Sequence, residues 1–374
     1  MSNLDYTQRS RRFAIRFPFL NELIIQINFW VMANIVLAVL LHLMYSSVNE
    51  NIKLPLAPKL GPTLSIGIII GILYGVAMGT TEYFLEKQFF RRRSLGITFL
   101  LKTAVSLITL VLLFGFVRFI LFDRLILPIM MKGQSPLNDQ SWKYTFLIFL
   151  LYYSLMTLVI TFFTQVNKKY GPGVLLPLLL GKYRQPKEEE RIFMFMDLKS
   201  STTIAEQLGH LRYSSFIRDS FLDINQVIGA YHAEIYQYVG DEIVLSWRMA
   251  EGLNELACIR FYFACGHQFQ QRAGYYDAHY GMVPFFKAGL HGGKITAVEI
   301  GEIKRDIAFH GDTINTAARI QSLCNSYHKS LLVSKQFTDY EGFNQLFTIE
   351  SLGRVNLKGR QEPVELVSVE GMKG

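Results

Sequence analysis

The segment "RIFMFMDLKSSTTIAEQLG", residues 191–209, places an apolar run directly before a carboxylate and a group of hydroxyl side chains. Ile192–Met196 is apolar at every position, which predicts a central strand covered on both faces. Asp197 is the residue at which this strand ends. Thr203 and Glu206 follow at capping-box spacing, so we expect a helix whose first backbone N–H groups favour an anion, above all phosphate. An ordinary capped helix has the same pattern, so the interpretation needs a second feature.

The second feature is "YQYVGDEIVLSW", residues 236–247, in which Gly240 and Asp241 join two strand-like runs. This composition is typical of a tight hairpin, which carries its turn carboxylate to the rim of a sheet. There Asp241 would lie beside Asp197. Two carboxylates at one strand edge supply the hard oxygen ligands that a pair of magnesium ions needs in phosphoryl chemistry.

The rest of the C-terminal half alternates strand-like and helix-like segments, which predicts an α+β domain with helices packed on a sheet. The strand candidates are 191–197, 233–239, 242–247, 285–291, 295–309 and 363–369, and the helix candidates are 201–230, 250–273 and 311–325.

The N-terminal half contains apolar stretches long enough to cross a hydrocarbon core of roughly 30 Å, which needs about 20 helical residues. They are approximately 23–45, 63–84, 97–120 and 145–166. Basic residues gather before the first stretch, between the second and third, and after the fourth: Arg9, Arg11, Arg12, Arg16, Lys87, Arg91, Arg92, Arg93, Lys168 and Lys169. By the positive-inside rule, both termini and the C-terminal domain are expected in the cytoplasm, with the chain in the cell (inner) membrane.

The second stretch has Gly67, Gly71, Gly75 and Gly79 four residues apart, which predicts a close helix–helix packing face. Contact within one chain and contact between two copies both fit this spacing. Polar residues inside the stretches mostly lie near the ends, where snorkelling suffices. They are Asn28, Asn34, His42, Glu82, Lys102 and Arg118, and a lone His42 argues against a haem site.

Composition limits the remaining function classes. The chain has 374 residues, a formal charge of +8 and 50% hydrophobic residues. Because many cations lie beside apolar segments, the charge indicates membrane topology and argues against nucleic-acid binding. Cys258, Cys265 and Cys324 have no metal or disulfide spacing. The expected divisions are a cytoplasmic segment 1–22, a four-helix transmembrane domain 23–166, a linker 167–190 broken by Gly171, Pro172 and Gly173, and a catalytic domain 191–374.

The C-terminal half resembles the class III nucleotidyl cyclases, in its bacterial membrane-anchored form, through five motifs in order. "FMFMDLKSSTTIAEQLG" and "YQYVGDEIVLSW" look like the family's metal-binding segments. "FKAGLHGGKITAVEIG" is similar to its R-x-G-x-H-x-G strand, "HGDTINTAARIQ" to its G-x-x-x-N-x-A-x-R helix, and "VNLKGRQEPVELVSV" to its closing LKG hairpin. The resemblance implies a ferredoxin-like α+β cyclase domain.

The resemblance also implies an active site. Asp197, Asp241 and the Leu198 carbonyl would bind two Mg²⁺ or Mn²⁺ ions, Asn315 would orient the ribose, and Arg319 would stabilise the α-phosphate in the transition state. The triphosphate would be held by the backbone of Ser200, Ser201, Thr202 and Thr203 and by Lys358, with Lys287 at a position where the family often has arginine. The family shares its site across a head-to-tail dimer, so we expect a homodimer, reinforced by the glycine face.

Base recognition departs from the family pattern, because Gln237 and Ala308 stand where a lysine and an Asp or Thr are usual. Ala308 offers no side-chain hydrogen bond, and Gln237 can donate or accept. ATP is favoured as the substrate, and GTP and pyrimidine triphosphates stay open. A diguanylate cyclase competes with this interpretation, since "VGDEI" is similar to that family's GGDEF turn, and so does an inactive membrane receptor or scaffold that keeps the cyclase fold. The sequence indicates neither a ligand of the membrane domain nor a receptor of the product.

Overall fold

The computed structural model describes residues 17–52, 60–88, 95–120, 138–170, 181, 183–303 and 305–372. The chain divides into two compact units, one formed by Arg16–Leu175 and the other containing Leu176–Gly374. The N-terminal arginines and the Gly171–Gly173 break of the expected linker lie outside the described residues.

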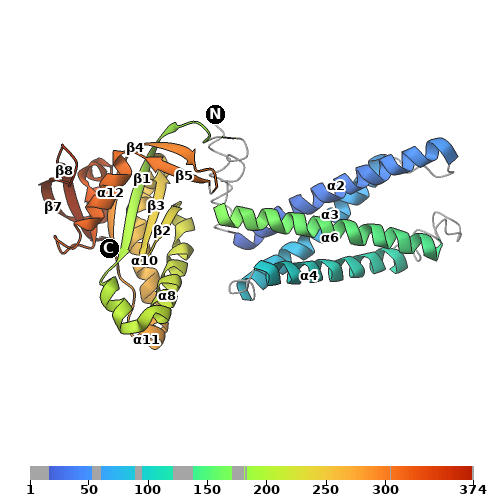
Figure 1. The fold of residues 1–374 in the computed structure, drawn as a ribbon, viewed down its shortest axis with the longest axis horizontal. Coiled ribbons are helices and arrows are strands. Elements are labelled where there is room, and N and C mark those ends of the chain that lie inside the picture. The colour runs from blue at the N-terminus through green and yellow to red at the C-terminus, as the bar shows by residue number, and fades with distance from the viewer. Residues whose placement is uncertain are drawn as a thin grey trace. The chain divides into compact units, whose positions relative to one another are not determined.

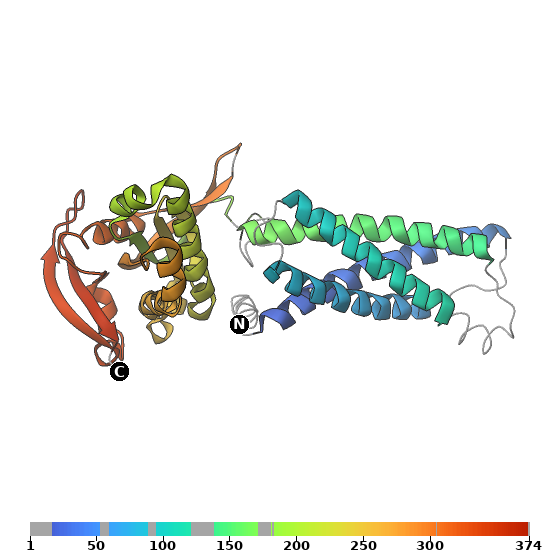
Figure 2. The ribbon, with the colours of Figure 1, turned by 90° about the horizontal axis from the view of Figure 1, so that it is seen from below.

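The first unit consists, over its described ranges, of four long helices that run side by side (Figure 2). They are α2 (Pro18–Ile52), α3 (Leu60–Gln88), α4 (Leu95–Gly115) and α6 (Asp139–Tyr170). Four stretches are long and apolar enough to cross a membrane: Phe19–Glu50, Leu60–Phe84, Leu100–Ile120, which extends five residues beyond α4, and Asp139–Val166. The four apolar spans predicted from the sequence are therefore confirmed as helices.

The glycine face of α3 packs against α2 of the same chain. A Cβ atom at Gly75 would lie 2.5 Å from the Ile27 Cα, and one at Gly71 would lie 2.7 Å from the Val31 Cα. Only glycine permits this approach of two helix backbones. The expectation that this face reinforces a dimer is therefore wrong, because the spacing identifies the face but not its neighbour.

Polar side chains of the spans meet inside the bundle. Glu82 of α3 and Lys102 of α4 form an ion pair in which both side chains are buried. The expectation that snorkelling suffices is wrong for this pair, because a buried charge in the bundle needs an opposite charge beside it.

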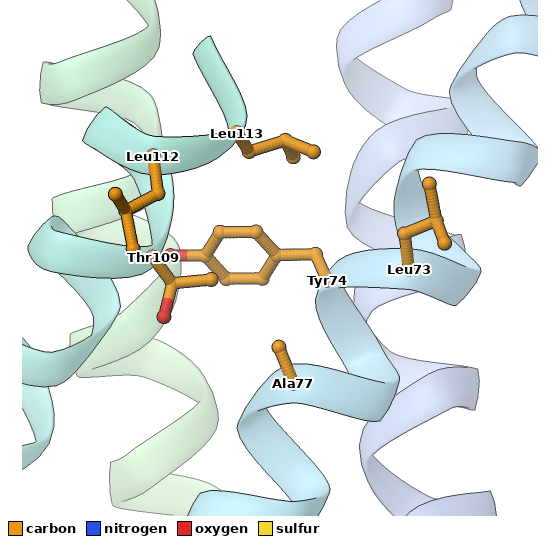
Figure 3. A pocket seen from close by; sticks show the side chains of 6 residues that line it. All are labelled: Leu73, Tyr74, Ala77, Thr109, Leu112 and Leu113. Atoms are coloured by element: carbon orange, nitrogen blue, oxygen red, sulfur yellow. The ribbon is translucent and has the colours of Figure 1, made fainter. Parts of the chain in front are cut away.

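Hydroxyl groups form a second polar connection between the helices. Figure 3 shows Tyr74 extending from α3 toward α4, in a pocket that Thr109 and Leu112 also line. The Tyr74 hydroxyl is 2.6 Å from the Ser106 Oγ, which is 2.6 Å from the Thr157 Oγ1 of α6. This chain of hydroxyl groups links three of the helices.

The second unit is built on a mixed sheet with the strand order β2-β3-β1-β4-β6-β8-β7, and with β5 paired to β4 (Figure 1). The strands are β1 (Lys187–Leu198), β2 (Glu234–Val239), β3 (Glu242–Arg248), β4 (Phe286–Ile300), β5 (Asp306–His310), β6 (Leu331–Ser334), β7 (Phe347–Val355) and β8 (Val364–Met372). The α-helices are α8 (Ser201–Ile228), α9 (Met249–Leu253), α10 (Ala257–Gln271), α11 (Ala273–Tyr280), α12 (Asp312–Ser322) and α13 (Phe343–Leu346).

Both faces of β1 are covered, as the unbroken apolar run predicts. Met194 points into the main core, which includes Phe216 of α8 and Phe261 of α10. Phe193 points to the opposite face, into a cluster with Ala317 of α12. This double cover fixes β1 in the middle of the sheet and places Asp197 at its end.

The structure corrects several element boundaries. β1 begins at Lys187, earlier than predicted, and the strand expected at 295–309 is divided into the end of β4 and most of β5. The helix expected at 201–230 has non-helical dihedrals at Gly209, where φ is +70°. Because positive φ suits glycine, α8 changes direction there. The capping box is not the helix start: Ser200 is the N-cap residue, and Thr203 and Glu206 lie inside α8.

Candidate active site

The end of β1 brings three charged side chains together across neighbouring strands. Asp197 pairs in register with Glu242 of β3 on one side and with Lys287 of β4 on the other. The Lys287 ammonium is buried and donates a hydrogen bond to the Asn325 Oδ1. Side chains at paired positions lie on the same face of a sheet, so Asp197 lies between a carboxylate and an ammonium.

Asp241 lies in the two-residue turn between β2 and β3, where Gly240 supplies the positive φ of +61°. This is the hairpin that the sequence predicted. Burial raises the pKa of Asp197, and the neighbouring Asp241 carboxylate raises it further. Burial and the charges of Asp197 and Asp241 raise the pKa of Glu242 to about 7. The predicted proximity of Asp197 and Asp241 is therefore present in the structure.

These carboxylates fit a divalent cation, because like charges close together are stabilised by a positive charge between them. Leu198 is the last residue of β1, so its backbone adjoins Asp197. In the described part of the chain, no group of three His, Cys, Asp or Glu side chains is arranged to hold a metal. Two carboxylates still suit Mg²⁺, which keeps several waters and takes further ligands from substrate phosphates.

The start of α8 follows Asp197 closely. Ser200 adopts a left-handed backbone with φ 59°, and its side chain makes no capping hydrogen bond. The first-turn N–H groups, from Ser201 to Thr203, precede the first helical hydrogen bond, from the Ile204 N–H to the Ser200 carbonyl. Free N–H groups at a helix start are suited to an anion.

Tyr213 joins this region because α8 changes direction at Gly209. Burial and then the Asp241 charge raise the pKa of its hydroxyl, and the nearby Ser201 side chain lowers it. Tyr213 was not predicted from the sequence, since only the change of direction in α8 reveals that it lies near the carboxylates.

Helix α12 carries Asn315 and Arg319 one turn apart. The Asn315 Nδ2 donates to the Gly311 carbonyl at 3.2 Å, and its side chain is exposed. The Arg319 Nη1 is buried and has no hydrogen-bond partner among the described residues. An unpaired buried guanidinium N–H is costly, and an anionic ligand would satisfy it.

Arg319 and the carboxylates are not in contact within one chain. In the described part of the chain, no hydrogen bond or ion pair joins Asn315 or Arg319 to Asp197 or Asp241. Gln321 of α12 instead lies close enough to Asp197 to lower the pKa of that carboxyl, against the effect of burial. Sequence reasoning missed Gln321, because its partner is set by how α12 packs on the sheet.

Lys358 is exposed in the connection between β7 and β8. The next residue, Gly359, has φ +75°, and a Cβ atom there would lie 3.4 Å from the Arg319 Nη2. This connection therefore lies against the Arg319 guanidinium.

The two positions to which the resemblance assigns base recognition lie on β2 and β5. Gln237 is exposed, whereas Ala308 is buried. Their sequence neighbours Tyr236 and Phe309 are in ring contact, tilted by 35° with centroids 4.8 Å apart, and the Phe309 N–H donates to the Tyr236 hydroxyl at 3.3 Å. Strands β2 and β5 are thus held close together although they are not paired in the sheet.

The chain is similar to several known proteins. The chain is 36% identical over 210 residues to "Adenylate cyclase 2" of Rhizobium meliloti (strain 1021), which covers 56% of this chain and 58% of the relative. It is 25% identical over 195 residues to "Retinal guanylyl cyclase 1" of Mus musculus, which covers 50% of this chain and 17% of that protein. The chain thus spans less than two thirds of the length of either relative.

Among solved structures, a bacterial light-regulated adenylyl cyclase matches with a TM-score of 0.49 and 22% identity, over 58% of this chain and 64% of that one. The family model described as "Adenylate and Guanylate cyclase catalytic domain" matches residues 183–370. That match covers just over half of the chain, which therefore belongs to the class III adenylate and guanylate cyclase family.

Proposed function

We propose that the protein is a membrane-anchored nucleotidyl cyclase that converts a nucleoside triphosphate, most favourably ATP, to its 3′,5′-cyclic nucleotide and pyrophosphate. The observation that carries the proposal is the proximity of the Asp197 and Asp241 carboxylates at one edge of the sheet. The same chain carries Asn315 and Arg319 on α12. Family membership argues against a diguanylate cyclase.

Two Mg²⁺ or Mn²⁺ ions held by Asp197, Asp241 and the Leu198 carbonyl would activate the ribose 3′-hydroxyl and screen the charge of the leaving pyrophosphate. The chain's own groups hold the substrate. N–H groups at the start of α8 bind phosphate oxygens, and Lys358 binds the terminal phosphates as a point charge. Lys287, which is paired with Asn325, contributes positive charge beside Asp197.

In the reaction, the 3′-oxygen forms a bond to the α-phosphorus while the bond from that phosphorus to the bridging oxygen breaks. The hydroxyl proton passes to solvent, and pyrophosphate leaves. Arg319 acts where charge develops at the α-phosphate, since its buried Nη1 has no partner to give up among the described residues. Asn315 holds the ribose so that attack is in line.

A homodimer with shared sites accounts for the separation of the two sets of groups. Within the described part of one chain, Gln321 lies close to Asp197, whereas no hydrogen bond or ion pair joins Arg319 to it. A second copy of the chain supplies the missing half in a head-to-tail arrangement, which forms two sites. The domain divisions at 23–166 and 191–374 then correspond to anchor and catalytic domain, with the latter in the cytoplasm, and a ligand of the membrane domain remains unassigned.

ATP is favoured because the relative with the higher identity is named an adenylate cyclase. Gln237 and Ala308 provide only one hydrogen-bonding side chain between them. A site that has few polar contacts to the base discriminates weakly, so GTP and pyrimidine triphosphates are expected as poorer substrates.

The test uses the full-length protein purified in detergent and incubated separately with ATP, GTP, CTP and UTP in Mn²⁺. Mass spectrometry identifies the products, with Asp197→Asn as the control. A 3′,5′-cyclic nucleotide that is absent from the control supports the proposal. Absence of any cyclic product from the wild-type protein overturns it and favours an inactive scaffold.

A further inference from the structure

The connection between β7 and β8, residues 356–363, contacts α12 through one apolar and one polar residue. Leu357 is buried in a cluster with Ile320 of α12 and Leu366 of β8. Beyond it, the Arg360 Nη1 donates to the Thr316 Oγ1 at 3.1 Å and lies 3.4 Å from the Asp312 Oδ2. The Arg360 backbone N–H also donates to the Leu357 carbonyl at 3.0 Å, which closes the turn.

Leu357 and Arg360 flank Lys358, to which the proposed reaction assigns phosphate binding, and Gly359, which lies beside Arg319. Lys358 and Gly359 lie between Leu357 and Arg360, and a Cβ atom at Gly359 would lie 3.4 Å from the Arg319 Nη2. The Arg319 Nη1 has no hydrogen-bond partner among the described residues, so no acceptor there orients the guanidinium. The backbone at Gly359 lies beside the guanidinium on its Nη2 side.

The contacts of Arg360 are poorly suited to stabilising the fold. Asp312 has 57% of its side chain exposed, and exposed ion pairs contribute about 0–1 kcal/mol. Thr316, in contrast, is completely buried, so its hydroxyl has a fixed position. These contacts therefore contribute little to stability, but they fix where the Arg360 side chain lies on α12.

We propose that Arg360 is a positioning residue that holds the Lys358–Gly359 turn against α12, and so sets the geometry of both Lys358 and Arg319. This inference rests on the proposed cyclase function and assigns Arg360 no contact with substrate. Without Arg360, the turn is held to α12 by Leu357 alone. Lys358 would then spend less time at the terminal phosphates, and Arg319 would lose the backbone surface behind it.

The test measures kcat and KM for the favoured triphosphate and the thermal unfolding of the full-length detergent-solubilised protein. Arg360→Gln should lower kcat about tenfold and raise KM severalfold, since small misplacements of catalytic groups cost up to about a hundredfold in rate. Thr316→Val, which removes the acceptor at nearly constant volume, should give the same loss. Thr316→Ser keeps the hydroxyl and should stay near wild type, and Arg360→Lys should recover part of the rate.

The matched control is Arg354→Gln. Arg354 makes a surface ion pair with Glu365, with the Nε and Oε1 3.2 Å apart, on the same hairpin but away from α12. If Arg360→Gln and Arg354→Gln have the same kcat and KM, the positioning role is refuted. The same holds if Arg360→Gln lowers the unfolding temperature without changing either constant. An inactive wild-type protein would instead overturn the cyclase proposal, and this inference with it.

Discussion

A Cβ atom at Gly289 of β4 would lie 2.6 Å from the Cα of Gln321 in α12. No side chain fits in that space, so glycine sets how closely α12 approaches the sheet. The same approach places Gln321 beside Asp197. The spacing of α12 from β4 therefore controls the position of groups in the proposed active site.

Replacing Gly289 with Ala should move α12 away from β4. We expect a loss of about 1–3 kcal/mol in stability, the usual cost of overpacking, together with at least a roughly tenfold lower kcat. Gly266→Ala is the control, because a Cβ atom at Gly266 of α10 meets nothing within 4 Å. Thermal unfolding and turnover measured on both variants check this. An unchanged kcat in Gly289→Ala would show that the spacing between α12 and β4 does not affect turnover.

Breaking the buried ion pair in the four-helix unit should destabilise the protein. Lys102→Met leaves the Glu82 carboxylate buried without its ammonium, which costs about 3–5 kcal/mol when one partner of a buried pair is removed. The exchange Glu82→Lys with Lys102→Glu restores opposite charges and should recover part of the loss. Unfolding in detergent is the measurement, and equal melting of Lys102→Met and wild type would contradict the prediction.

His291 should make stability depend on pH. Burial, and then the Arg360 charge, lower the pKa of His291 to about 4 from its ordinary 6.5. Between these values the unfolded chain binds more protons than the folded one, so stability is complete above about pH 6.5 and falls as the pH falls toward 4. Because a shift of one pKa unit corresponds to 1.36 kcal/mol, the free energy of unfolding should fall by about 3 kcal/mol.

The control for this pH dependence is His291→Gln, which removes the titrating ring and keeps a side chain able to hydrogen-bond Ser334, the partner of the His291 Nδ1 at 2.9 Å. Thermal unfolding followed from pH 7 to pH 4 should show a smaller decline in the variant. Parallel curves would mean that His291 does not cause the decline.

Arg319→Lys should lower kcat by about 10³-fold, because lysine keeps the charge and loses the planar fork that contacts two phosphate oxygens. Folding should be unaffected, since the Arg319 Nη1 makes no hydrogen bond to any described residue. Turnover and unfolding temperature are measured on the same sample. Activity within tenfold of wild type would remove Arg319 from the reaction.

Local signals explain what the sequence alone predicted. Asp197 follows a strand of apolar residues, and Asp241 lies beside a turn glycine, so both positions can be recognised from a few neighbouring residues. The membrane spans follow from hydropathy in the same way. Asn315, Arg319 and Lys358 came from the family resemblance and not from spacing.

What the sequence missed depends on contacts between distant segments. Tyr213 reaches the carboxylates only because α8 changes direction at Gly209, and Gln321 reaches Asp197 only through the packing of α12 on Gly289. The packing of the glycine face of α3 on α2 likewise depends on contacts between different helices. The short strand β6 has no periodicity long enough to identify it.

The most direct test of the shared-site cyclase is complementation between two inactive chains. Asp241→Asn and Arg319→Ala are each expected to be inactive alone. Co-expressed, they form heterodimers in which one site carries both substitutions and the other carries neither, so random pairing should restore about a quarter of wild-type activity. Recovery near that level supports catalysis at sites built from two chains. No recovery, with both chains present in purified heterodimers and the wild type active, would contradict it.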